Sequence, residues 1–304
     1  MFFIVSKLIF LMVLSQMVCS MAGCSQSVSR CNGYCGRHFK YEFLSLCIDS
    51  FRQKGDSFGV CFTTDILNEC LDKKANPLKP NVTQNPSSWS CTPQIFHDNA
   101  SMLEFFLPYL QVLHAPLGVL IDPNRTSKKV VDQQRRAKCL ANLLRSHHTT
   151  VRLMDGRCGF LLLFMKAVRD RYGVKYLNSL KIELVDIDDS VTQWHKKFYR
   201  CPTFRCTTEN VLSLKAPLPD TTLLYLNFCG ISKSFDMVRE YLKTYRIECV
   251  ISFSVARRAA VKDYGKSLIS LKGKFLKKLP SERKDFETWV VALTKDSAER
   301  GVDV

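Results

Sequence analysis

Asp155, Asp186 and Asn227 each follow a short run of apolar and β-branched residues, where their side chains could do chemistry. A carboxylate accepts hydrogen bonds from hydroxyl groups, while a side-chain amide can both accept and donate. The amide oxygen of Asn227 could hold an exocyclic amine by accepting its hydrogens. Asp155 and Asp186 have a simpler alternative role, because aspartate commonly caps the helix that follows a strand.

The elements that must position these side chains alternate between strand and helix patterns. Strand patterns cover 149–155, 181–185, 206–212, 221–226, 247–255 and 286–293, and helix patterns cover 130–145, 160–173, 190–197 and 232–245. Gly173 can end the second of these helices in a left-handed cap conformation. Trp194 and Phe198 lie four residues apart on one helical face, which we expect to be buried.

Strands separated by helices predict parallel βαβ units with right-handed crossovers, and so an α/β fold with a mainly parallel sheet. Ligands of such sheets bind at the carboxyl ends of the strands. We therefore expect the strands that end at Asp155, Asp186 and Asn227 to be adjacent, with these side chains at one edge of the sheet.

This order of elements resembles the class I S-adenosylmethionine-dependent methyltransferases, a Rossmann-like methyltransferase sandwich, over about residues 135–295. In that family the first strand leads into an acidic residue and a glycine-rich turn. Asp155, Gly156 and Gly159 stand at the matching positions of this chain. The resemblance implies that these residues contact S-adenosylmethionine.

The resemblance also assigns roles at the ends of the later strands. The carboxylate that binds the ribose hydroxyls of the cofactor corresponds to Asp186, and a polar residue near the adenine corresponds to Asn210. The fourth strand of the family carries the catalytic motif, and Asn227 stands there. The implied activity is methyl transfer from S-adenosylmethionine.

The chain departs from the family pattern at two places. Arg157 and Leu161 stand where the family usually has glycine, and Asn227 lacks the prolines that often follow it. A side chain in the turn can crowd the methionine end of the cofactor. An alternative is therefore a methyltransferase-like scaffold or binding module without activity.

The charge of the chain favours polyanionic partners. Among 304 residues there are 44 lysines and arginines against 28 acidic residues, a formal net charge of +16, while 46% hydrophobic residues is ordinary for a globular protein. Basic residues crowd two stretches, 125–157 and 257–284. Nucleic acid or an anionic membrane surface would suit them, and a basic soluble protein without such a partner is the alternative.

Residues 1–23 resemble a targeting segment. Lys7 is their single charge, an apolar core follows from Leu8, and small residues around Met21 fit a cleavage site. The apolar run is short for a membrane span, which needs about 20 residues. The segment predicts the secretory pathway or a lipoprotein-like membrane tether; if Met21 is the true start, the protein is cytoplasmic or nuclear.

Residues 24–95 form a Cys-rich region, with 14 cysteines in the whole chain. Cys31, Cys35 and His38 could contribute to a zinc site, although no pair has the C-x2-C spacing. Disulfides in an oxidising compartment, or plain thiols, are the alternatives. Prolines among polar residues in 71–95 predict a linker, which places the methyltransferase-like domain at 96–304.

The sequence is compatible with three functions. The first is a methyltransferase, whose basic stretches suggest a nucleic-acid substrate. The second is the inactive scaffold or binding module. The third is a secreted or membrane-tethered disulfide-rich protein, in which the α/β domain serves as a stable partner.

Overall fold

The computed structural model describes residues 36–72, 92–114, 128–153, 159–186, 189–208, 221–229, 248–256, 275–279 and 286–293. The chain forms two compact units, one of residues 1–91 and 111–127, the other of residues 92–110 and 128–304. The sequence placed a boundary near residue 95, and the extent of a Cys-rich region up to that point stays a prediction.

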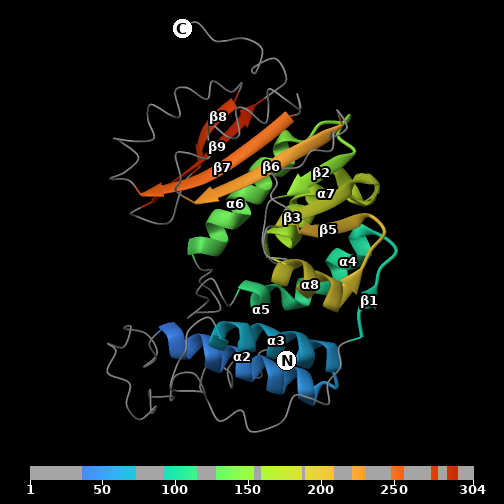
Figure 1. Cartoon of the computed structure of the whole chain (residues 1–304), viewed down its shortest axis with the longest axis vertical. Helices are drawn as coiled ribbons and strands as arrows, with labels where there is room; N and C mark the ends of the chain where they lie inside the picture. The colour runs from blue at the N-terminus through green and yellow to red at the C-terminus, as the bar shows by residue number, and fades with distance from the viewer. Residues whose placement is uncertain are drawn as a thin grey trace, which may run out of the picture. The chain divides into compact units, whose positions relative to one another are not determined.

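The second unit is built on a seven-stranded sheet (Figure 1). Its strands are β2 (Thr150–Leu153), β3 (Lys181–Asp186), β5 (Phe204–Thr208), β6 (Thr222–Cys229), β7 (Glu248–Ala256), β8 (Phe275–Leu279) and β9 (Phe286–Leu293). Across the sheet they stand in the order β5-β3-β2-β6-β7-β9-β8. The first five are parallel, and β9 runs antiparallel to both of its neighbours, β7 and β8.

The chain changes direction across the sheet at β2. It proceeds from β2 outward to β3 and β5, then returns to the other side of β2 with β6 and β7. The strand order therefore reverses between β2 and β6, which is the topological switch point of a doubly wound sheet. This Rossmann-like methyltransferase arrangement, with its mainly parallel sheet, is the one that the sequence predicted.

The register confirms that the three predicted strands are neighbours. Val151 of β2 lies opposite Ile182 of β3 on one side and Leu223 of β6 on the other. All three strands run in the same direction, so their carboxyl ends meet at one edge of the sheet. Asp155 itself lies outside the described residues.

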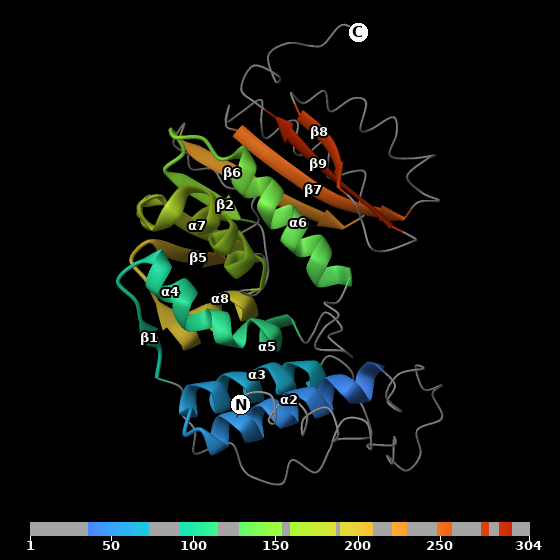
Figure 2. The ribbon, with the colours of Figure 1, turned by 180° about the vertical axis from the view of Figure 1, so that it is seen from behind.

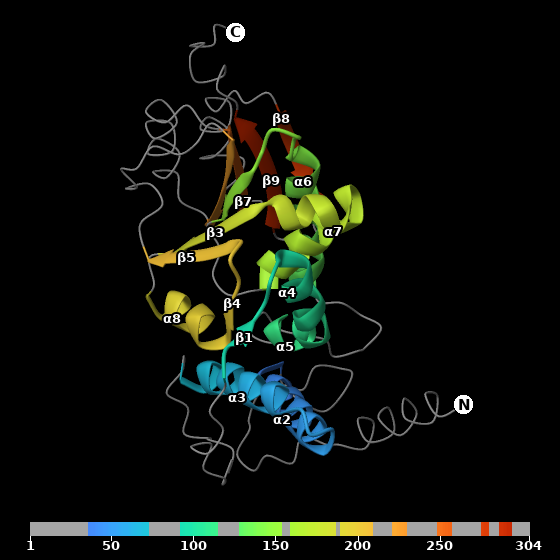
Figure 3. The same ribbon diagram turned by 90° about the vertical axis from the view of Figure 1, so that its right-hand side faces the viewer.

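In the described part of the chain, α4 (Asn99–Phe106), α6 (Lys128–Leu143) and α7 (Gly159–Ser179) lie over one face of the sheet (Figures 2 and 3). Helix α6 packs on α7, and α4 packs on α7 from another side. This explains why nearly every residue of α7 from Gly159 to Val168 is buried, since the helix has neighbours all round. After α4 the chain continues through a 3-10 turn, η2 (Leu107–Tyr109), and α5 (Leu110–His114).

Asn99 ties α4 to the end of α7 with a fully satisfied amide. Its nitrogen donates to the carbonyl oxygens of Leu177 and Leu180 at 2.9 and 2.8 Å, and its oxygen accepts from the Thr203 hydroxyl at 2.8 Å. Asp98 caps the helix by accepting from the Ser101 backbone N–H at 2.8 Å. A buried amide with all these partners costs little and fixes the helix in place.

The prediction that Gly173 ends a helix is wrong. Gly173 does have a positive φ of 82°, but its ψ of 172° is not the left-handed cap conformation, and α7 resumes after it to Ser179. This backbone region is essentially confined to glycine. The residue therefore kinks the helix instead of terminating it.

Other element boundaries also differ from the sequence patterns. Helix α8 (Asp189–Phe198) begins one residue before the expected start, and β5 begins at Phe204. The sequence did not predict β8, nor the two-residue strands β1 (Gln94–Ile95) and β4 (Tyr199–Arg200), which pair in parallel. Trp194 and Phe198 are buried, as expected from their spacing. The predicted helix at 232–245 lies outside the described residues.

The first unit contains the helix pair α2 (Gly36–Gln53) and α3 (Ser57–Asp72), joined by a turn in which Gly55 has a φ of 68°. Leu44, Phe62 and Ile66 are buried in its core. Cys61 is disulfide-bonded, and burial raises the pKa of the Cys47 thiol to about 12. No helix among the described residues is long and apolar enough to span a membrane, and residues 1–23 are not among them.

Candidate functional site

The described part of the chain contains three of the six predicted site residues. Gly159 is the first residue of α7, Asp186 is the last residue of β3, and Asn227 lies near the end of β6. They come from the helix that follows β2 in the chain and from the two strands that flank β2 in the sheet. The other three lie outside the described residues: Asp155, Gly156 and Asn210.

Asp186 is half-buried at the carboxyl end of β3, opposite Thr208 of β5. Its negative charge contributes, after burial, to raising the pKa of the nearby Cys206 thiol. Asp189 anchors α8 to the end of β5, because its carboxylate accepts a hydrogen bond from the Thr208 hydroxyl at 3.1 Å.

Asn227 belongs to a polar network that the sequence did not predict. Its Oδ1 atom accepts a hydrogen bond from Nη1 of Arg136 at 2.9 Å and another from the Ser252 hydroxyl at 3.2 Å. The hydroxyl groups of Ser252 and Tyr225 lie 2.7 Å apart, and both residues are buried. The network thus joins α6, β6 and β7.

The start of α7 is fixed against the same network. The ring of Phe160, the second residue of α7, stacks on the ring of Tyr225, with centroids 4.9 Å apart and planes 9° from parallel. Such a pair contributes about 0.5–1.5 kcal/mol beyond its buried area. The position of the helix that follows β2 is therefore coupled to the strand that carries Asn227.

Several basic residues of the stretch 125–157 have partners within the fold. Besides Arg136, the described pairs are Arg135 with Asp132 at 3.9 Å, Arg145 with Glu248 at 3.6 Å and Arg152 with Glu183 at 2.6 Å. Lys138 on α6 is exposed. The number of cations available to a phosphate backbone is therefore smaller than the sequence count suggests.

A cluster of His147, His148 and Glu248 brings three potential metal-ligand atoms within 4.8 Å of one another, at the amino-terminal edge of the sheet. Nδ1 of His148 accepts a hydrogen bond from the Arg145 backbone N–H at 3.0 Å. The ring proton must then sit on Nε2, which lies 3.0 Å from a carboxylate oxygen of Glu248. In this arrangement neither ring nitrogen of His148 offers a lone pair to a metal.

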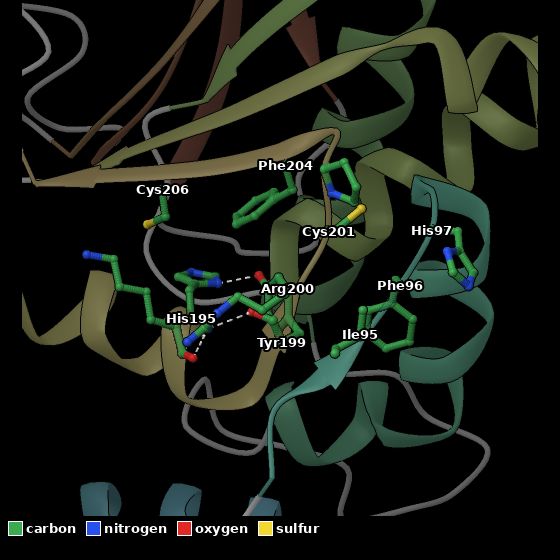
Figure 4. A pocket seen from close by; sticks show the side chains of 11 residues that line it. Ile95, Phe96, His97, His195, Tyr199, Arg200, Cys201, Phe204 and Cys206 are labelled. Carbon is green, nitrogen blue, oxygen red and sulfur yellow. Dashed lines mark hydrogen bonds between the residues drawn. The ribbon is translucent and has the colours of Figure 1, made fainter.

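A cavity of about 560 Å³ lies between α8, β5 and the short strands β1 and β4 (Figure 4). Its walls are mostly apolar and include Phe96, Tyr199 and Phe204. The Tyr199 hydroxyl shares a hydrogen bond with Nδ1 of His195, and the Arg200 guanidinium donates to the Lys196 carbonyl at the end of α8. None of the predicted site residues lines this cavity; Cys206, on its wall, is the neighbour of Asp186.

No protein-family model matches the chain, and no curated protein does. Solved methyltransferase structures do match. The METTL16 methyltransferase domain is 12% identical and the match covers 65% of this chain and 82% of that one, with a TM-score of 0.38. The 23S rRNA methyltransferase ErmE is 11% identical over 55% and 68%, with a TM-score of 0.35.

The strand order, with β9 antiparallel between β7 and β8 beside five parallel strands, is that of the class I methyltransferase fold. A SAM-dependent O-methyltransferase from Thermotoga maritima is 8% identical, and the match covers 53% of this chain and 65% of that one with a TM-score of 0.35. The strand order and the position of Asp186 and Asn227 are the observations that bear on function.

Proposed function

We propose that the second unit is an S-adenosylmethionine-dependent methyltransferase that acts on nucleic acid. The observation that carries the proposal is the sheet edge at the switch point, where Asp186 and Asn227 lie on strands either side of β2. Ligands of doubly wound sheets bind in the crevice at this edge.

The described residues fit such a cofactor. Asp186 offers a half-buried carboxylate that can accept two ribose hydroxyl protons, and Gly159 begins the buried helix that comes next after β2 in the chain. When bound, S-adenosylmethionine supplies a methyl group that is already electrophilic. The protein then has to align a nucleophile with this methyl group and accommodate one proton.

The nucleic-acid part of the proposal rests on charge. The chain carries a net charge of +16, and cations that contact phosphates release counterions and so contribute to binding. In the stretch 125–157 the exposed Lys138 is a candidate for such a contact, whereas Arg136 and Arg152 are engaged inside the fold. Of the second basic stretch, 257–284, the structure describes residues 275–279.

Calorimetric titration of the full chain with S-adenosylmethionine tests the proposal. The substitution Asp186→Ala should weaken binding roughly ten- to a hundredfold, because a hydrogen bond to a charged group contributes about 1.5–3 kcal/mol. Asp170→Ala is the matched control, since it removes an exposed carboxylate of α7 that pairs with Lys166. The control should bind like the wild type.

A wild-type chain that gives no heat with millimolar cofactor would contradict the proposal. The scaffold alternative would then take its place, and it has support in Arg157 and Leu161, which replace turn glycines of the family. Salt-dependent binding of nucleic acid without cofactor binding would identify that alternative.

A further inference from the structure

The orientation of the Asn227 amide is determined by the chemistry of its partner. An arginine guanidinium has five N–H donors and no acceptor, so the Asn227 atom that lies 2.9 Å from Arg136 must be the oxygen. The Nε atom of Arg136 is buried without a partner among the described residues. The hydrogen bond to Asn227 is therefore a principal anchor of this cation.

Ser252 reinforces the same orientation. Its hydroxyl has a single hydrogen, which is directed to Oδ1 of Asn227. The hydroxyl of Tyr225, 2.7 Å from Oγ of Ser252, must then be the donor of that pair. Tyr225 therefore donates a hydrogen bond to Ser252, and Ser252 donates one to Asn227. Arg136 donates the second hydrogen bond to the same Asn227 oxygen.

This network uses the whole acceptor capacity of Asn227. An amide oxygen has two lone pairs, and here both receive hydrogen bonds. An exocyclic amine cannot be held by this oxygen unless Arg136 or Ser252 is displaced. The Nδ2 group, with two hydrogens, takes part in neither contact.

We propose that Arg136 is a positioning residue that fixes Asn227 as a hydrogen-bond donor toward its ligand. The group that Asn227 holds is then an acceptor, such as a carbonyl or a ring nitrogen. If Asn227 holds the atom that is methylated, that atom is not an exocyclic amine. The statement about the substrate rests on the proposed function, whereas the amide orientation does not. The sequence alone suggested the opposite polarity for Asn227.

Nuclear magnetic resonance tests the orientation without any ligand. In the full chain labelled with 15N-asparagine, the Asn227 side-chain resonances are assigned by their loss in Asn227→Asp. We expect the Nδ2 hydrogens to exchange freely with water, and we expect Arg136→Met to shift or broaden them. Arg135→Met, which removes the neighbouring cation that faces Asp132, should leave them unchanged. Protection of the wild-type Nδ2 hydrogens would overturn the proposal, and so would an Arg136→Met spectrum with no change.

Methyl transfer from S-adenosylmethionine to total RNA, followed by mass spectrometry of the nucleosides, tests the substrate. The wild type should place methyl groups on oxygen, carbon or ring nitrogen. Asn227→Asp keeps a partner for Arg136 and removes both donors, so transfer should fall at least tenfold while Tm is maintained. An Asn227-dependent methyl group on an exocyclic amine would overturn the proposal. If the wild type transfers no methyl group, the proposed methyltransferase function is wrong, and so is the inference about its substrate. The nuclear magnetic resonance experiment would still test the orientation of the Asn227 amide.

Discussion

At the scale of single residues, Arg136 differs most from its sequence interpretation. Arg136 belongs to the basic stretch 125–157, which the sequence suggests for binding a polyanionic partner. In the structure its guanidinium instead donates a hydrogen bond to Asn227. A signal for this was present, because Arg136 lies four residues before Leu140, which is fully buried on the same helical stripe. Ser252, a hydroxyl in the apolar run 247–255, was a second signal, since a buried polar group needs a partner.

For Asp186, in contrast, residue type and position in the sequence were sufficient to predict where the residue lies in the sheet. A carboxylate that follows an apolar run was expected at the carboxyl end of a parallel strand, and β3 ends at this residue. The contacts of Asn227 could not be predicted in the same way. They depend on residues of α6 and β7 that lie 91 and 25 positions away in the chain.

His148 predicts a pH dependence of stability. Burial, together with the charges of His147 and Arg145, lowers its pKa against the opposing effect of Glu248. Below the ordinary histidine pKa of about 6.5 the unfolded chain binds a proton that folded His148 does not, so stability falls as pH decreases. The slope for one proton is at most about 1.4 kcal/mol per pH unit.

Urea unfolding between pH 7.5 and 5.5 measures this effect. His148→Asn keeps an acceptor for the Arg145 N–H and should flatten the dependence, although it lowers stability at neutral pH. His147→Asn changes the exposed neighbouring ring and should leave most of the slope in place. An identical slope in His148→Asn and the wild type would contradict the assignment.

At the scale of elements, the parallel strands were predictable because most of them are short apolar runs that alternate with helical patterns in the sequence. The strands β1, β4 and β8 were not, since two have only two residues and β8 carries lysines in its sequence, Phe-Leu-Lys-Lys-Leu. Gly173 was recognised as a conformational exception, but a glycine pattern cannot distinguish a helix end from a kink. The residues after Gly173 decide whether the helix ends or kinks there, because Leu177 is buried in the core and the helix continues to reach it.

Gly173 supplies the prediction at this scale. No atom lies within 4 Å of the position that a Cβ would occupy, so Gly173→Ala costs backbone strain and no clash. We expect a loss of about 1–3 kcal/mol in the free energy of unfolding, because this φ/ψ region is unfavourable for alanine. Val174→Ala, at the exposed neighbouring position, should change stability little.

Denaturant midpoints compare the two variants under the same conditions. If Gly173→Ala were stabilising, as alanine is inside a regular helix by about 1 kcal/mol, the kink would not be a feature of the folded protein. In that case α7 would be a continuous helix.

At the scale of the whole molecule, the disulfide of Cys61 bears on the compartment. Stable disulfides belong to oxidising environments, and the secretory route suggested by residues 1–23 stays a prediction. If that route is correct, N-terminal sequencing of the protein from its native cells should begin at Gly23, after the small residues around Met21. A mature protein beginning at Met1 or Met21 would contradict it and would favour a cytoplasmic or nuclear location.

The net charge of +16 supplies the last prediction, which concerns binding of nucleic acid by the full chain. Each lysine that contacts a phosphate releases a counterion, so the logarithm of affinity falls linearly with the logarithm of salt concentration. If the stretch 125–157 forms part of the contact, Lys138→Gln should weaken binding of single-stranded RNA for all sequences alike and reduce the salt slope by about one.

Lys175→Gln is the matched control, because Lys175 is an exposed lysine of α7 that lies outside both basic stretches. Fluorescence anisotropy with a labelled oligonucleotide between 50 and 200 mM salt, roughly the range in which phosphate contacts are most sensitive, compares the three proteins. Equal slopes for Lys138→Gln and Lys175→Gln would mean that α6 does not face the nucleic acid. A wild-type affinity that does not change with salt would mean that the charge serves no polyanionic partner, since phosphate contacts cannot form without releasing counterions.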